Sequence, residues 1–106
     1  MYYSYYGIYS AKKFIQNSNV IEIEFAEINS TLSEDEITDI KALFTNANWN
    51  ELKQKYDIST TNYFIFDDEL MVGILEAKED TLLIKIGRKQ YMLDGITNNI
   101  YSLIGY

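Results

Sequence analysis

The side chains in this sequence that could take part in chemistry are almost all carboxylates, amines and phenols. Sixteen Asp and Glu residues occur with nine Lys and Arg and ten Tyr, and the chain has no His, no Cys and no Pro. These absences exclude thiol nucleophiles, disulfide bonds, Cys/His zinc sites and any mechanism that needs an imidazole base. A catalytic site would have to be built from carboxylates, lysines or tyrosines.

One acidic segment resembles a catalytic signature. Asp67, Asp68, Glu76 and Lys78 are similar to the Asp…Glu-x-Lys signature of a large nuclease superfamily. In those enzymes the carboxylates hold a divalent metal and the lysine helps to activate the attacking water. If Asp67 and Asp68 form a hairpin tip, Glu76 lies about 26 Å further along the next strand, at roughly 3.3 Å per residue. A small metal-dependent nuclease is therefore the least favoured function.

Two other kinds of site are tested by spacing alone. Asn46, Asn48, Asn50 and Asp57 occupy positions 1, 3, 5 and 12 of a calcium-loop template, but Glu51 stands where the sharp turn requires Gly. Calcium binding is rejected on that ground. The chain also has no Gly-rich phosphate loop, because its five Gly residues are scattered. We expect no catalytic residues, no metal and no cofactor.

The charge balance indicates what kind of partner the protein has. The net charge is −7, whereas phosphate affinity comes from clustered Lys and Arg. We therefore expect no direct binding to nucleic acid and no attachment to anionic membranes. An acidic surface favours solubility and fast association with a basic protein. The expected partner is a basic protein, either a nucleic-acid-binding enzyme or a toxin.

The acids are concentrated in two parts of the chain. Between Lys13 and Lys41 there are seven acids and no basic residue, and a second group of acids spans residues 67–80. The Tyr-rich start of the chain has two interpretations, because tyrosines are common at interfaces and in edge strands. We expect the partner-binding residues to be Glu22, Glu24, Glu27, Glu34, Asp35, Asp67, Asp68, Glu69, Tyr3 and Tyr6.

Two elements that would position these acids have clear local signals. Apolar and acidic residues alternate over 20–26, which predicts a strand with Glu22 and Glu24 on its polar face. Ser33 and Glu36 have the spacing of a capping box, which predicts that a helix starts at this point. Glu34 and Asp35 would then lie at the positive end of the helix dipole.

The remaining elements are predicted from weaker patterns. Residues 2–9 could form an edge strand, Ser10 could cap a short helix through Gln16, and Asn48 could begin a second helix with Trp49 on its apolar face. Apolar runs over 63–66, 70–77, 82–86 and 90–93 predict an antiparallel meander with short turns, including a Gly-first turn at 87–88. The tail from residue 97 could form a short helix, or 94–95 could turn into another strand.

Together these elements predict one domain over residues 1–106 of the α+β class. We expect an antiparallel sheet of about five strands, ending in a C-terminal meander, with two to three helices packed on one face. The chain has no apolar run near the roughly 20 residues that a membrane span requires and no secretory signal at its start, so we expect a cytoplasmic protein.

Size, acidity and codon usage suggest a functional class. Ile, Tyr, Asn and Lys, whose codons are AT-rich, are abundant, and Pro is absent. In composition the chain resembles the small acidic proteins that phages and plasmids make against host nucleases, such as anti-CRISPR and anti-restriction proteins. The resemblance implies a non-enzymatic inhibitor that blocks a basic nucleic-acid-binding surface, in some cases by imitating nucleic-acid charge. The alternative is an immunity protein that neutralises a cognate toxin.

Overall fold

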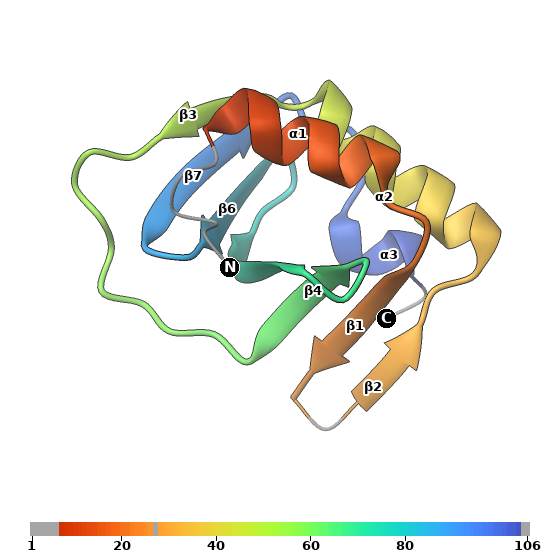
Figure 1. Ribbon diagram of the computed structural model, residues 1–106. Coiled ribbons are helices and arrows are strands. Elements are labelled where there is room, and N and C mark those ends of the chain that lie inside the picture. Colours follow the sequence, from red (N-terminus) through yellow and green to blue (C-terminus); the bar gives the residue numbers. More distant parts are fainter. Residues whose placement is uncertain (1–6, 27, 105–106) are drawn as a thin grey trace.

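The computed structural model describes residues 7–26 and 28–104, which form a seven-stranded antiparallel sheet with three helices on one face (Figure 1). The strand order across the sheet is β2-β1-β4-β5-β6-β7-β3. The elements in chain order are α1 (Ile8–Asn17), β1 (Ile21–Phe25), β2 (Ile28–Thr31), α2 (Glu34–Asn46), β3 (Asn48–Glu51), β4 (Asn62–Phe66), β5 (Leu70–Ala77), β6 (Thr81–Ile86), β7 (Lys89–Asp94) and α3 (Ile100–Leu103). The predicted α+β class is confirmed, with seven strands instead of about five.

The hydrophobic core lies between the inner face of the sheet and the helices. Phe44 of α2 is fully buried at its centre, with ring centroids 6.1 Å from Phe64 and 5.8 Å from Phe66 in edge-to-face geometry. Aromatic pairs in this arrangement add stability beyond their buried area. The other buried helix residues are Ala11, Ile15, Ile40 and Ile100. All three helices thus cover the same face of the sheet.

The clearest sequence signals are confirmed. In β1, Ile21, Ile23 and Phe25 are buried, and the glutamates between them face the other side of the sheet. Ser33 caps α2 in a complete capping box: its Oγ accepts from the Glu36 amide at 3.3 Å, and Glu36 Oε1 accepts from the Ser33 amide at 2.9 Å. The tail forms the short helix α3, and Ile100 is buried as expected.

The helix expected from Asn48 is wrong, because that segment is the edge strand β3. It pairs with β7 from Asn48 opposite Asp94 to Glu51 opposite Tyr91. The Trp49 side chain points into the core, where Nε1 donates to the Phe44 carbonyl at 2.8 Å. Pairing with a distant strand therefore overrides the local helical pattern.

The first helix also begins earlier than expected. α1 starts at Ile8, after Gly7 as its N-cap, so Ser10 lies inside the helix and Tyr9 is helical. Ile15 is buried and Phe14 is half-buried, as the apolar pattern indicated. The rest of the predicted Tyr-rich strand, residues 2–6, lies outside the described residues. β2 was not predicted because all four of its residues are exposed and show no alternation.

A long connection crosses the outer face of the sheet. Residues 52–61 run from β3, at one edge, to β4, which lies on the other side of β5, β6 and β7 (Figure 1). The buried Gln90 side chain holds this segment with two hydrogen bonds to the Tyr56 backbone, of 2.9 and 2.8 Å. Gly73 makes room for it, since a Cβ there would lie 3.1 Å from Thr60 Cγ2.

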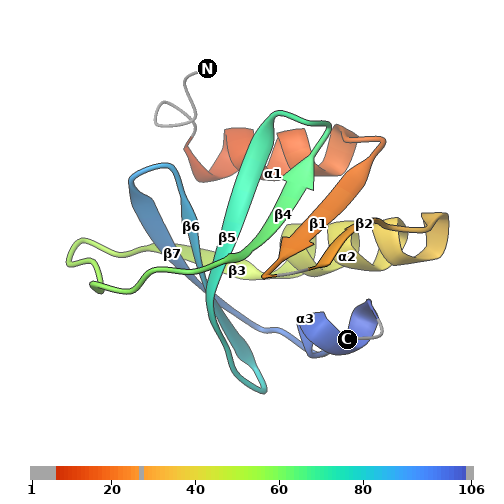
Figure 2. The ribbon, with the colours of Figure 1, turned by 90° about the horizontal axis from the view of Figure 1, so that it is seen from below.

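The sheet is bent along β5, the longest strand. The register between β5 and β6 shifts between Ile74 and Glu76, as in a β-bulge. Bulges increase local twist and bend the strand that carries them. Figure 2 shows β5 curving as it passes from β4 towards the β6 side of the sheet. Within the described part of the chain, no helix has the length and apolar character needed to cross a membrane.

Candidate functional site

Three chain segments bring acids to one end of the sheet. β1 begins at Ile21, which pairs with Phe66 at the end of β4, and the Leu32 amide after β2 donates to the Ile21 carbonyl at 2.9 Å. The start of β1, the start of α2 and the β4–β5 turn are therefore neighbours. We use the name acidic end for the seven acids that these segments carry, of which Glu24 lies furthest along β1: Glu22, Glu24, Glu34, Asp35, Asp67, Asp68 and Glu69.

The β4–β5 turn places its acids by an unusual backbone conformation. Asp67 and Asp68 have φ angles of 52° and 58°, and the Glu69 amide donates to the Phe66 carbonyl at 3.1 Å. Two successive residues with positive φ are typical of a type I′ hairpin turn. Asp67 Oδ1 also accepts from the amides of Asn19 and Val20, at 2.8 and 2.9 Å. Asp67 thus ties the turn to the loop before β1, while Asp68 and Glu69 are exposed.

The other acids of this end differ in what they contact. Glu36 lies next to the acidic end but is not counted in it, because its carboxylate is part of the capping box of α2. Glu34 and Asp35 lie exposed in the first helical turn, where the helix dipole favours negative charge. Glu22 is half-buried and Glu24 exposed, both on the outer face of β1. Most of these carboxylates are thus available to a partner.

The acidic end is not neutralised by ion pairs within the described residues. The two ion pairs there, Lys78–Glu76 at 3.8 Å and Lys89–Glu51 at 3.9 Å, lie elsewhere. Lys41 Nζ instead donates to the Ser18 carbonyl at 2.8 Å. A second cation, Lys13, lines the same cavity as Asp67, and neither lysine forms an ion pair with these acids among the described residues. The seven acids therefore outnumber the cations beside them, and this end of the molecule is negative.

The second acidic group predicted from the sequence is divided by the fold. Asp67, Asp68 and Glu69 precede β5, whereas Glu76 lies near its far end and Glu79 and Asp80 follow it. The carboxylates of the nuclease-like signature are thus at opposite ends of one strand, as the hairpin argument required. Among the described residues, no group of three or more carboxylates is arranged to hold a metal ion.

Three expected partner-binding residues cannot be placed. Glu27, Tyr3 and Tyr6 lie outside the described residues. The expectation that they contact a partner stays a prediction.

A groove of opposite charge was missed in the sequence analysis. The connection from β3 to β4, residues 52–61, is called the crossing segment. Together with the β6–β7 hairpin it lines a cavity of about 310 Å³. We call it the basic groove; it is lined by Lys55, Tyr56, Lys85, Arg88, Lys89 and Gln90, together with Gly87. A signal was present, since three cations fall within residues 85–89. Lys55 is thirty positions away in the sequence, and only the path of the crossing segment brings it to the hairpin.

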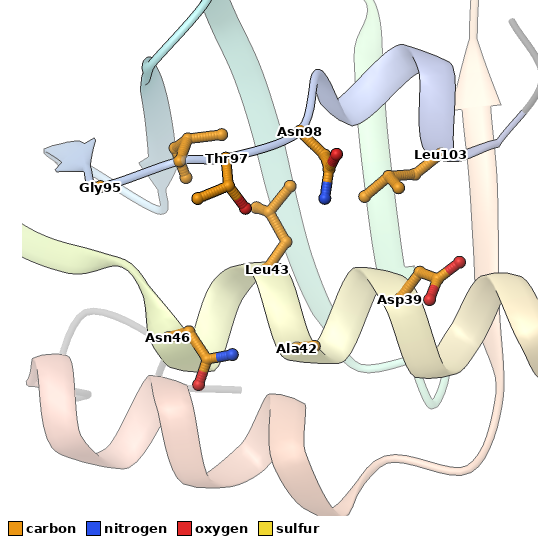
Figure 3. A pocket seen from close by; sticks show the side chains of 9 residues that line it. Asp39, Ala42, Leu43, Asn46, Gly95, Thr97, Asn98 and Leu103 are labelled. Atoms are coloured by element: carbon orange, nitrogen blue, oxygen red, sulfur yellow. The ribbon is translucent and has the colours of Figure 1, made fainter.

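A second cavity lies between α2 and the segment that leads to α3. It has a volume of about 200 Å³, and in Figure 3 Leu43 and Leu103 point towards each other across it. Polar side chains at its rim include Thr97 and Asn98, and its one ionisable lining residue is Asp39. A single carboxylate without a second acid, base or nucleophile beside it does not make an acid/base pair.

Comparison of the chain with protein-family models, with curated proteins and with solved structures finds no match.

Proposed function

We propose that this protein is a non-enzymatic inhibitor of the anti-defence type, anti-CRISPR-like or anti-restriction-like. It binds a basic nucleic-acid-binding surface of a host nuclease through its acidic end. One observation supports this proposal above the others: acids from three separate chain segments gather at one end of the sheet, and neither of the described ion pairs involves them.

The arrangement suits recognition of a basic groove. Glu22 and Glu24 project from the same face of one strand, and Asp68 projects from a turn whose backbone is fixed by Asp67. The backbone that carries these charges is ordered before binding, so the entropy cost of association is limited to the side chains. Complementary charge also speeds the encounter of the two proteins. A partner whose own groove binds phosphates would meet spaced negative groups on this surface.

The test begins with affinity capture of the partner from host cells and continues with the purified pair. Association rates should fall as salt rises, because exposed charges are screened within about 8 Å at physiological ionic strength. A nucleic-acid duplex should compete with the protein for the partner. The partner's nuclease activity should decrease as the protein is added.

A matched pair of variants separates this surface from net charge. Glu22→Gln, Glu24→Gln and Glu34→Gln together remove three charges from the acidic end. Glu76→Gln, Glu79→Gln and Asp80→Asn remove three charges from the other end of β5. We expect the first variant to associate about tenfold more slowly at low salt, since rim charges act mainly on association. The second variant should stay within about twofold of the wild type.

Other outcomes would overturn the proposal. One is equal slowing in both variants, which would make net charge the cause. Another is a complex whose association rate does not change with salt, with which nucleic acid does not compete, and which is lost in the Tyr3→Ala or Tyr6→Ala variant. Binding would then take place through the aromatic start of the chain, and the acidity would serve solubility.

A further inference from the structure

The basic groove collects cations in a protein whose net charge is strongly negative. Its lining contains Lys55, Lys85, Arg88 and Lys89, four of the nine Lys and Arg residues of the chain, and no acid. Of these, Lys89 alone takes part in a described ion pair, at 3.9 Å to the exposed Glu51. Exposed pairs of this length contribute little. The groove therefore keeps a net positive charge, because among the described residues only Glu51 forms an ion pair with one of its four cations.

The groove is held in shape by contacts that do not use its cations. The Gln90 side chain, 7% exposed, accepts from the Tyr56 amide and donates to the Tyr56 carbonyl. The Leu52 amide donates to the Gln90 carbonyl at 2.9 Å. On the other side, the two-residue turn has a positive φ of 60° at Gly87, as the Gly-first turn predicts. Both walls are thus fixed before a ligand arrives.

The lining residues match the chemistry of a phosphorylated aromatic ligand. The Arg88 guanidinium can bind two phosphate oxygens at once, and lysine amines add point charges. Tyr56, whose side chain is 54% exposed, lines the same cavity and offers a ring on which a base can stack. The volume of about 310 Å³ is at the lower end of the roughly 300–1,000 Å³ typical of small-ligand sites.

The distribution of charge favours a small ligand over a long polyanion. In Figures 1 and 2 the β6–β7 hairpin and the start of α2 lie on opposite sides of the molecule. The described chain measures 34 × 30 × 27 Å, several times the screening length of about 8 Å. A single nucleotide in the groove would be screened from the acidic end, whereas a long strand would extend over the acidic remainder of the surface.

From these observations we propose that the basic groove binds a free nucleotide, with its phosphates at Lys55, Lys85, Arg88 and Lys89 and its base against Tyr56. This site is separate from the acidic end and does not depend on the inhibitor function.

Titration calorimetry of the full-length protein with ATP, GTP and inorganic triphosphate tests the proposal. We expect both nucleotides to bind more tightly than triphosphate. Tyr56→Ala should weaken nucleotide binding roughly tenfold and leave triphosphate binding unchanged, because base stacking is lost and the phosphate contacts remain. The two hydrogen bonds to Gln90 use the Tyr56 backbone, so this variant keeps the wall in place. Tyr9→Ala, which replaces an exposed tyrosine outside the groove, is the control.

A second pair of variants tests the phosphate contacts. Lys55→Gln with Arg88→Gln should weaken ATP and triphosphate alike by about tenfold, whereas Lys13→Gln with Lys78→Gln should leave both unchanged. All four side chains are exposed, and the two variants have the same net charge. Equal weakening by both variants would mean non-specific attraction and would overturn the site.

Three further results would also overturn the proposal. One is the absence of ATP and GTP binding at millimolar concentration. Another is triphosphate binding as tight as nucleotide binding, together with no effect of Tyr56→Ala. The third is preference for a 20-nucleotide strand or for polyglutamate over ATP, which would make the groove a site for a macromolecule.

Discussion

At the scale of single residues, one serine determines where α2 begins. Ser33→Ala removes the side-chain acceptor of the capping box and should lower the free energy of unfolding by about 1 kcal/mol. Ser10 is a contrasting site, because it lies inside α1 and is exposed. Ser10→Ala should raise stability by up to about 0.5 kcal/mol, since alanine is the better helix former. Urea unfolding of both variants checks the two signs; a loss at Ser10 would mean that it caps the helix after all.

The two aspartates of the β4–β5 turn have the same backbone conformation and different side-chain roles. Glycine relieves a positive φ at either position, but only Asp67 accepts from two backbone amides. Asp67→Gly should therefore destabilise the protein by about 1–3 kcal/mol. Asp68→Gly should stabilise it, because Asp-Gly is a preferred type I′ pair. Thermal unfolding of the two variants measures both effects. Stabilisation of both would show that relief of backbone strain outweighs the lost hydrogen bonds, and destabilisation of both would contradict the prediction for Asp68.

At the scale of elements, the crossing segment can pack closely on β5 because Gly73 has no side chain. An added Cβ at Gly73 would lie 3.1 Å from Thr60 Cγ2, Tyr63 Cε1 and Lys85 Cγ at once. Gly73→Ala should cost about 1–3 kcal/mol, as overpacking does. Thr60→Ser removes the methyl group and keeps the hydroxyl that accepts from the Asn62 amide.

The double variant provides the control for this prediction. In a double-mutant cycle, Gly73→Ala should be less destabilising in the Thr60→Ser background than in the wild type. Strict additivity would mean that Thr60 does not restrict this position, and that the path of the crossing segment is set elsewhere.

Elements with complete local signals could be predicted, and those that depend on distant partners could not. β1 and the start of α2 carry their own alternation and capping box, and both are confirmed. In β3, Asn48 and Glu51 have the spacing of a helix start, and Trp49 has the spacing of a helical face with Leu52. Only pairing with β7 makes the segment a strand. The same limit applies to the sites. In the sequence Asp67 and Glu76 belong to one acidic group, but the fold places them at opposite ends of β5. Lys55 and Arg88 are far apart in the sequence, but the fold brings them into one groove.

At the scale of the whole molecule, stability in alkali depends on a buried phenol. Tyr91 is 1% exposed and its ring lies 5.4 Å from that of Trp49. Burial raises the pKa of Tyr91 above its ordinary value, and the charge of Glu51 raises it further. Above pH 10 the unfolded chain therefore releases this proton more readily than the folded protein, so the free energy of unfolding falls as pH rises.

Replacing that phenol should remove its part of the pH dependence. Tyr91→Phe keeps the ring in the core, so its stability should exceed that of the wild type increasingly as pH rises above about 10, with little change of the difference below. Chemical unfolding between pH 8 and 11 measures this. Tyr9→Phe, at an exposed position, should follow the wild-type curve. Parallel curves for wild type and Tyr91→Phe would mean that the phenol does not resist ionisation in the folded state.

The path of the chain from β3 to β4 has a consequence for synthesis and folding. The strands from β4 to β7 join neighbours through short turns, whereas Asn48 meets Asp94 across 46 positions of sequence. Such contacts close large loops and form slowly. On the ribosome β3 emerges long before β7 has been synthesised. Trp49 therefore packs into the core only after β7 is present and pairs with β3. Since it is the chain's one tryptophan, its fluorescence reports the final closure of the sheet.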